Sequence, residues 1–443
     1  MSNSLETKGI PPTRNELVKK LQKPGIAWLN LQGKCKMVQA MEKSGDIEVL
    51  KRTFRENLPL ALELKRVIGK YAEAVREKEN CELIKIMNFC GTHEWTATQY
   101  SLRELLPPFI ELVAGPGCPV CVVPSYYVDV AVKLAQGGAK VYTYGDSLRL
   151  RSAKADHPAS LEEARAEGGD VKVVYSFLDA VKDSRASGKD GVFFGIGFET
   201  TAPSYAIAMK EGMVPDNLKF LSALRLTPAA MKYTIKLHRE RGLLPISGVI
   251  APGHVSTIIG AAEWEFLPKL YGLPTVVAGF EPIDVLMAVA QILLMMKDDR
   301  PEIKVEYNRM VGWGGNEYAK KMIDEVFEKT NAAWRGIGFI PGSGLKLREK
   351  FQGHDAFRHH GIPDLAPEEF IYTHAHHGVP WEHDLPPKCR CSEVVVGIAK
   401  PTDCPLFMKG CSPASPWGPC MVSSEGVCSV WARHGGAAKL EGD

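Results

Sequence analysis

The sequence predicts an α/β protein built on mostly parallel sheets, and two observations lead to this prediction. Between residues 84 and 311, short apolar runs alternate with segments in which apolar residues recur at helical spacing. This alternation is typical of parallel strands that are connected through helices. Eight strands in about 230 residues also fit two modest sheets better than one wide sheet. The expected strands are 84–89, 140–144, 171–175, 192–198, 220–226, 246–251, 275–280 and 305–311.

The expected helices lie before these strands and between them. A long helix is predicted at 47–77, where Phe54, Leu58 and Leu62 recur at helical spacing. Shorter helices are predicted at 125–136, 160–167, 202–210, 228–241, 256–264 and 282–297.

Changes of composition divide the chain into four parts. Residues 1–50 are polar and basic and contain several prolines, which indicates a peripheral extension. In the polar segment 179–191 we expect the chain to pass from one sheet to the other. This division gives α/β domains at 51–185 and 186–330, followed by a cysteine-rich region at 331–443.

Length and composition limit the class of protein. The 443 residues suggest two to four domains at roughly 150 residues each. Basic and acidic residues nearly balance, at 54 and 52, so charge gives no reason to expect binding to nucleic acid. The longest apolar runs are too short and too broken to span a membrane, and the N-terminus shows no signal peptide. Eleven cysteines in such a chain predict a reducing compartment, the cytoplasm, where clustered thiols bind metal or perform redox chemistry.

Three cysteines lie near the start of the α/β region. Cys90 ends the apolar run 84–89 and is followed by Gly-Thr-His, so that His93 lies three residues further on. The carboxyl end of a strand is where an open parallel sheet presents side chains to a ligand. Cys118 and Cys121 form a CxxC pair, which can close a disulfide, bind a metal or hold one thiolate at a lowered pKa. The alternative is that these cysteines are small buried hydrophobic residues.

Polar side chains follow two further predicted strands. Glu199 and Thr200 follow one of them, and His254 follows another, each in a glycine-containing turn. We therefore expect Glu199 and His254 to be functional, whereas Thr200 is explained equally well as a helix cap. The glycines at 195–197 lack the third glycine of a dinucleotide-binding motif, so no nicotinamide or flavin cofactor is predicted.

The C-terminal region has a different composition, rich first in histidine and then in cysteine. The histidines suit an exposed loop, with zinc binding as the alternative. Six cysteines occur within 40 residues in loops rich in proline and glycine. Their spacing suits an iron–sulfur cluster held by four thiolates, with a structural zinc as the competitor. The histidines are His354, His359, His360, His374, His376, His377 and His383, and the cysteines are Cys389, Cys391, Cys404, Cys411, Cys420 and Cys428.

Four motifs together resemble the HypD family of [NiFe]-hydrogenase maturation proteins. They are CGTH at 90–93, GPGCPVC at 115–121, GFETTAP at 197–203 and the cysteine-containing tail at 403–428. The likeness extends over roughly residues 50–433, although Glu94-Trp95 departs from the usual family pattern after CGTH.

The resemblance implies a fold and an activity. The implied fold is two Rossmann-like parallel-sheet domains that face a cleft, plus an irregular C-terminal domain with a [4Fe–4S] cluster. The implied activity is that of a redox-active scaffold on which the Fe(CN)2CO group of [NiFe]-hydrogenase is assembled. The implied partners are a HypC-type chaperone and a HypE-type donor, which delivers cyanide as a thiocyanate.

The resemblance also implies roles for particular residues. Cys90 would hold the iron that carries cyanide and carbonyl ligands, with His93 beside it to orient or tune the site. Cys118 and Cys121 would exchange electrons with the cluster as a dithiol/disulfide pair. The other implied residues are Glu199, Thr200 and His254 in the cleft, Cys389, Cys404, Cys411 and Cys428 as cluster ligands, and Cys391 and Cys420 as a second thiol pair. Spacing alone does not decide between Cys389 and Cys391 as a cluster ligand.

Two other functions fit the same residues. A cluster-containing thiol–disulfide oxidoreductase would use the CxxC pair to reduce a protein disulfide, and would do so without a chaperone partner. A zinc-stabilised interaction module would contain zinc and no iron after anaerobic purification.

Overall fold

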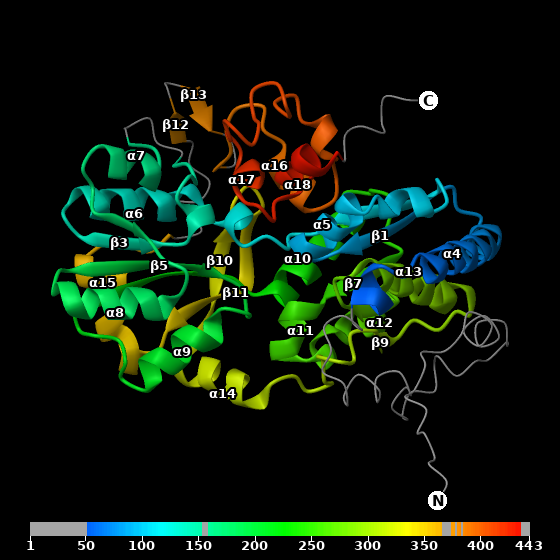
Figure 1. Ribbon diagram of the computed structural model, residues 1–443, viewed down its shortest axis with the longest axis horizontal. Coiled ribbons are helices and arrows are strands. Elements are labelled where there is room, and N and C mark those ends of the chain that lie inside the picture. The colour runs from blue at the N-terminus through cyan, green and yellow to red at the C-terminus, as the bar shows by residue number, and fades with distance from the viewer. Residues whose placement is uncertain (1–50, 153–157, 366–373, 377–378, 382–383, 436–443) are drawn as a thin grey trace, which may run out of the picture.

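Two parallel sheets form the centre of the molecule (Figure 1). The computed structural model describes residues 51–152, 158–365, 374–376, 379–381 and 384–435, so the predicted extension at 1–50 lies outside the described residues. The first sheet has the strand order β2-β1-β7-β8-β9 and the second the order β4-β3-β5-β6, with every pairing parallel. The predicted α/β class with parallel sheets is confirmed. The strands are β1 (Ile84–Asn88), β2 (Ile110–Ala114), β3 (Lys140–Thr143), β4 (Val171–Val173), β5 (Gly191–Gly197), β6 (Leu218–Leu224), β7 (Gly248–Pro252), β8 (Thr275–Ala278) and β9 (Ile303–Val305).

Helices cover both faces of each sheet (Figure 1). In the first sheet, α4 and α13 bury apolar residues against one face, and α10, α11 and α12 do so against the other. In the second sheet, α6 and α7 lie on one face and α8 and α9 on the other. The bounds are α4 (Leu58–Glu79), α6 (Ser125–Gln136), α7 (Leu161–Ala166), α8 (Phe177–Ser187), α9 (Ala202–Lys210), α10 (Thr227–Glu240), α11 (Gly253–Ile259), α12 (Phe266–Tyr271) and α13 (Pro282–Lys297).

The chain does not change sheets in the segment 179–191, where the change was expected. That segment contains most of α8, and β5 after it pairs with β3 in the same sheet. The second sheet is instead one continuous stretch, from β3 to β6, inserted between β2 and β7 of the first sheet. The alternation of strands and helices predicts parallel pairing, but it contains no information about which earlier strand a later one joins.

Several boundaries differ from the sequence-based expectations. The helix predicted at 47–77 starts as α4 only at Leu58, because Asn57 caps it by accepting a hydrogen bond from the Leu60 amide at 3.2 Å and a proline occupies its first turn. The strand predicted at 305–311 ends at Val305. Five strands were not predicted, since their sequences mix polar and small residues or lie next to prolines. They are β2, the antiparallel pair β10 (Phe327–Trp334) and β11 (Gly338–Leu347), and the short antiparallel pair β12 (His374–His376) and β13 (Val379–Trp381).

The part of the C-terminal region that the structure describes from residue 384 to residue 435 consists of turns and short helices. It lies above α5 (Gly91–Gln99) and α6 in Figure 1, against the loop after β2. No helix among the described residues is long and apolar enough to cross a membrane. The remaining elements are α14 (Glu317–Val326), α15 (Ala356–His360), β12 (His374–His376), β13 (Val379–Trp381), α16 (Cys391–Val395), α17 (Pro419–Val422) and α18 (Val427–His434).

Candidate functional site

A cavity of about 490 Å³ lies where the two sheets present their strand ends to each other. In the first sheet, β1 pairs with β2 on one side and β7 on the other, so successive strands run outward in opposite directions from the β1/β7 pair. The β3/β5 pair is the corresponding point of the second sheet. Such switch points are where open α/β sheets bind ligands. We call this space the strand-end cavity, lined by Cys90 after β1, His254 after β7, Asp146 after β3, Thr200 after β5, and Glu425.

Cys90 occupies the cap position immediately before α5. Burial, which has the largest effect, and the nearby Glu425 carboxylate together raise the pKa of its thiol to about 11. The backbone N–H groups of Thr92 and His93 at the start of the helix act in the opposite direction, but more weakly. Cys90 is therefore a neutral thiol near pH 7, and a cation in the cavity is what would convert it to a thiolate.

His93 is near Cys90 in the chain, but it does not line the cavity. It is buried, and its Nε2 donates a hydrogen bond to the Gly279 carbonyl oxygen at 2.8 Å. Burial lowers the pKa of His93 to about 4, so the imidazole is neutral at pH 7 and brings no positive charge to Cys90. Burial therefore excludes the imidazolium form of His93, which would have favoured a thiolate at Cys90. The hydrogen bond of His93 instead holds α5 against the loop after β8.

His254 and Thr200 lie in the cavity wall, whereas Glu199 does not. The His254 ring stacks on Phe280, with the ring centroids 3.9 Å apart. Glu199 is buried, and its Oε1 accepts hydrogen bonds from the Thr227 amide at 2.7 Å and the Thr227 hydroxyl at 3.2 Å. Burial raises the pKa of Glu199 to about 7. Glu199 thus joins the end of β5 to the start of α10. Thr200 lines the cavity and Glu199 does not, because the side chains of successive residues in an extended turn point in different directions.

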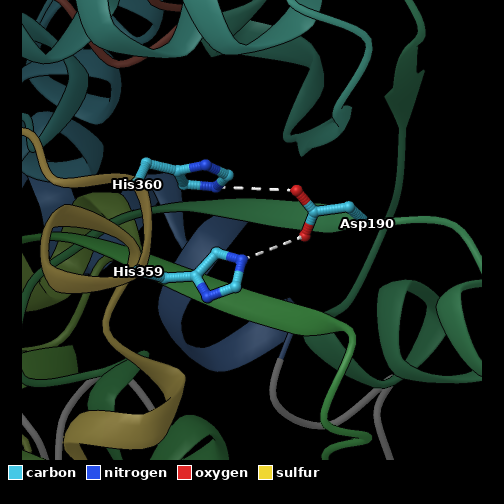
Figure 2. A group of neighbouring side chains, drawn as sticks. All are labelled: Asp190, His359 and His360. Atoms are coloured by element: carbon cyan, nitrogen blue, oxygen red, sulfur yellow. Dashed lines mark ion pairs between the residues drawn. The ribbon is translucent and has the colours of Figure 1, made fainter.

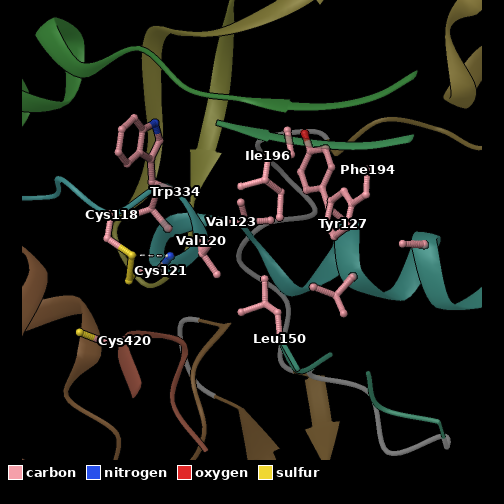
Figure 3. Packing of buried hydrophobic residues seen from close by; sticks show 14 of the residues in the cluster. Cys118, Val120, Cys121, Val123, Tyr127, Leu150, Phe194, Ile196, Trp334 and Cys420 are labelled. Carbon is pink, nitrogen blue, oxygen red and sulfur yellow. Dashed lines mark hydrogen bonds between the residues drawn. A yellow bond between two sulfur atoms is a disulfide. The ribbon is translucent and has the colours of Figure 1, made fainter. Parts of the chain in front are cut away.

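The CxxC pair lies directly behind the cavity wall. Cys118 and Cys121 form a disulfide, and both are buried (Figure 3). Gly117 packs closely against the residues that follow β1. A Cβ on Gly117 would lie 2.6 Å from the Cys90 amide nitrogen. Gly117, Pro119 and Val120 line the cavity. The loop of the disulfide and the loop of Cys90 therefore contact each other.

The six C-terminal cysteines surround one enclosed space, which we call the cysteine pocket. It adjoins the disulfide, since α17, which contains Cys420, packs against the turn Val120–Val122 (Figure 3). The thiol of Cys420 contacts those of both Cys391 and Cys428, and the thiols of Cys389 and Cys404 contact each other. The pocket is lined by Cys389, Cys391, Cys404, Cys411, Cys420 and Cys428, with Leu406, Phe407, Gly418 and Met421.

The donors in the cysteine pocket fit an iron–sulfur cluster. Cys411 Sγ accepts hydrogen bonds from the amides of Trp417 at 3.2 Å and Gly418 at 3.3 Å. Gly418 also lies so close to Cys389 that a Cβ there would be 2.8 Å from its sulfur. Backbone N–H groups directed at sulfur stabilise thiolate ligands and tune such clusters. All six sulfurs line the pocket, so the lining alone does not separate Cys389 from Cys391 as a ligand.

A buried network connects the two thiol sites, and the sequence did not predict it. Glu94, which is 1% exposed, accepts hydrogen bonds from Arg103 at 2.7 and 2.9 Å, Trp431 Nε1 at 2.7 Å and Asn88 Nδ2 at 3.1 Å. Glu94 is in the helix that follows Cys90, and Trp431 is in α18 with Cys428. The one feature of the sequence that could have drawn attention to Glu94 is the departure from the family pattern at Glu94-Trp95.

Asp146 and Glu425 are also cavity residues that the sequence analysis did not select. Asp146 accepts hydrogen bonds from the Ser424 amide at 2.9 Å, the Ser424 hydroxyl at 2.8 Å and the Ser423 hydroxyl at 3.2 Å. These contacts hold the C-terminal segment across the strand ends. Asp146 follows the predicted strand 140–144, so the rule that selected His254 applied to it equally.

These features define a class: a thiol-rich α/β protein in which a strand-end cavity, a disulfide and a pocket of six cysteines are neighbours. A family model described as HypD, Hydrogenase formation hypA family, matches residues 66–435. A hydrogenase maturation factor HypD of Cupriavidus necator is 38% identical over 361 residues, covering 79% of this chain and 89% of that protein. One of Azotobacter vinelandii is 38% identical over 357 residues, covering 79% and 89%. One of Rhizobium leguminosarum is 36% identical over 381 residues, covering 84% and 92%. The chain belongs to the HypD family.

Proposed function

We propose that this protein is a hydrogenase maturation factor that holds iron at Cys90 while cyanide and carbonyl ligands are attached to it. The observation that supports this most is the strand-end cavity, with a cysteine in its wall and a disulfide directly behind that wall. A HypC-type chaperone would supply a second thiolate to the iron, and a HypE-type protein would deliver the cyanide.

The iron is the cargo of this site, and Cys90 is its anchor. Low-spin iron with cyanide and carbonyl ligands needs soft, electron-rich donors, and a thiolate is such a donor. Because the pKa of the free thiol is about 11, iron binding must displace its proton. His254 lies in the same wall, and burial lowers its pKa, so its imidazole enters this step in the neutral form, without a positive charge that would repel the incoming iron.

Delivery of cyanide as a thiocyanate requires two electrons. In the reduced form, Cys118 and Cys121 supply them: a thiocyanate and two thiols give one thiol, one hydrogen cyanide and one disulfide. The S–CN bond breaks, the S–S bond of the pair forms, and the two thiol protons pass to the cyanide and to the donor sulfur. A disulfide between Cys118 and Cys121, as in this structure, is the form that such a step would leave.

A reductant must then return the disulfide to the dithiol with two electrons and two protons. Cys389, Cys404, Cys411 and Cys428 would hold a [4Fe–4S] cluster, which when bound supplies single electrons. Cys391 and Cys420 line the same pocket with their thiols in contact, and Cys420 is in α17, which packs against the turn that contains Cys121, so this pair would pass electrons from the cluster to the disulfide.

A thiol–disulfide oxidoreductase acting on protein disulfides is less well supported. Cys118 is 5% exposed and Cys121 is 1% exposed, so the disulfide of a folded partner does not reach them. Exchange of this kind needs direct attack of a thiolate on an accessible sulfur. Reduction of a thiocyanate held in the strand-end cavity needs only that two electrons pass through the wall that separates it from the pair.

The test is anaerobic co-purification with a HypC-type partner, followed by infrared spectroscopy in the cyanide and carbonyl region. Wild type and Cys81→Ala, which removes a thiol away from both sites, should show the iron-bound cyanide bands. Cys90→Ala should lose them and keep the absorption of the cluster. Retention of the bands in Cys90→Ala would refute the proposal.

A further inference from the structure

A third group of metal-ligating side chains lies at the opposite end of the second sheet (Figure 2). Asp190 directly precedes β5, and His359 and His360 are the last two residues of α15, which packs against β6. The strand-end cavity is at the carboxyl ends of these strands, so the two sites lie about 20 Å apart along the strands. The remaining histidines of this region, from 374 to 383, lie outside the residues whose side chains the structure describes.

The three side chains converge on a common point. His359 Nε2 lies 3.6 Å from Asp190 Oδ1, and His360 Nε2 lies 3.9 Å from Asp190 Oδ2. The three ligand atoms all lie within 4.8 Å of one another. These distances are too long for hydrogen bonds. They suit donors around one ion, since ligands about 2.0–2.2 Å from a metal lie roughly 3–4 Å from each other.

One of the two imidazoles has an unused ring nitrogen. His360 Nε2 is buried, and no residue in the described part of the chain forms a hydrogen bond with it. A buried polar atom without a partner is unfavourable, and the free energy is recovered when a ligand supplies the missing interaction. The atom faces the Asp190 carboxylate (Figure 2), so a cation between them satisfies both groups.

The frame around this group is fixed by other contacts. Asp355 caps α15 by accepting a hydrogen bond from the Arg358 amide at 2.9 Å, and Gly361 ends the helix in the left-handed conformation. The nearby cations have partners elsewhere. Lys189 pairs with Asp170 at 3.0 Å, and Lys219 donates to the Gly353 carbonyl oxygen at 2.7 Å.

We propose that Asp190, His359 and His360 bind one divalent transition-metal ion, at a site independent of the thiols. Two imidazoles and one carboxylate favour Zn²⁺, Co²⁺, Ni²⁺ or Cu²⁺ over Mg²⁺ and Ca²⁺, which prefer oxygen ligands alone. Three protein ligands leave a coordination position for water. The side chains of Asp190 and His359 are 45% and 43% exposed, so the ion exchanges with solvent.

The test counts bound metal in the full-length, anaerobically purified chain. Equilibrium dialysis against Zn²⁺ with elemental analysis should show one equivalent fewer in the His359→Ala/His360→Ala double variant than in wild type. The affinity for that equivalent should fall by about 100-fold or more, since loss of even an outer partner of a metal ligand costs 10–100-fold. His354→Ala removes a histidine from the same segment and should bind as wild type.

A second probe separates this site from the cysteines. Thiolate-bound Co²⁺ gives strong charge-transfer absorption, whereas Co²⁺ on imidazole and carboxylate gives only weak visible bands. The weak bands should disappear in Asp190→Asn and remain in Asp170→Asn, a matched carboxylate beside Lys189. If the double histidine variant does not fold, Asp190→Asn still tests whether the metal binds at this site. Unchanged metal content and unchanged visible bands in these variants would overturn the proposal.

Discussion

The strand-end cavity and the cysteine pocket are neighbours, but they are built in different ways. The cavity draws its wall from the ends of five strands, β1, β2, β3, β5 and β7, and from the tail, so its residues range from Phe89 to Glu425. The cysteine pocket draws all its sulfurs from one stretch of 40 residues, Cys389 to Cys428. The cavity is roomy, and charged and hydroxyl-bearing side chains are set in its largely apolar wall, whereas the pocket is enclosed by sulfur and apolar side chains. We infer that the strand-end cavity depends on the topology of the two sheets, whereas the cysteine pocket depends on a local stretch of sequence.

The largest expected effect comes from breaking the cysteine pocket alone. Cys411→Ser removes a sulfur that accepts two backbone N–H groups, so most of the cluster iron should be lost. Elemental analysis and visible absorption after anaerobic purification check this, with Cys81→Ser as the control. Zinc without iron in the wild-type protein would contradict the assignment and favour a structural zinc site.

Glu94→Gln should disturb the connection between the two regions. The change leaves Arg103 beside a neutral amide and weakens the bond to Trp431, so the free energy of unfolding should fall by about 3 kcal/mol. Denaturant unfolding measures this loss. Glu73→Gln on the exposed side of α4 should change stability by less than about 0.5 kcal/mol. Equal effects of the two substitutions would exclude a special role for the network.

Glu199→Gln tests whether this carboxyl supports the cavity from behind. Burial raises the pKa of Glu199 from 4.5 to about 7, so the folded protein keeps the proton to higher pH than the unfolded chain does. The stability of wild type should therefore fall by about 2–3 kcal/mol as pH rises from 4.5 to 7, and change no further above that. The glutamine variant should lack this component in a series of unfolding curves. The glutamine variant should also keep the infrared bands of iron-bound cyanide at full intensity. Loss of these bands would show that Glu199 takes part in the chemistry of the cavity.

Reduction of the disulfide should have the smallest effect on stability. The pair Cys118–Cys121 closes a loop of only four residues, which stabilises the fold by about 2 kcal/mol through loop entropy. Thermal unfolding of the Cys118→Ser/Cys121→Ser variant should show a loss of this size, with cluster absorption unchanged. A protein that fails to fold without the pair would show that the disulfide is structural.

The success and failure of the sequence-based predictions follow the same division. Cys90, Thr200 and His254 were expected at strand ends, and all three line one cavity, because parallel strands end at a common edge. Glu199 satisfied the same rule but points into the protein, since the rule does not fix the direction of each side chain in a turn. The neutral state of His93 depends on burial by residues far away in the chain, which no local pattern contains.

The sequence by itself determined the α/β class, four of the five strands that end at the cavity and the thiols available for chemistry, because these depend on local spacing. Only the tertiary structure decided which strands share a sheet, that Glu94 links the helix after Cys90 to α18, and that Asp190 meets His359 and His360. Each of these depends on where a distant segment returns to pack. The free energy that favours one such packing over another comes from many buried contacts, so no single sequence motif encodes it.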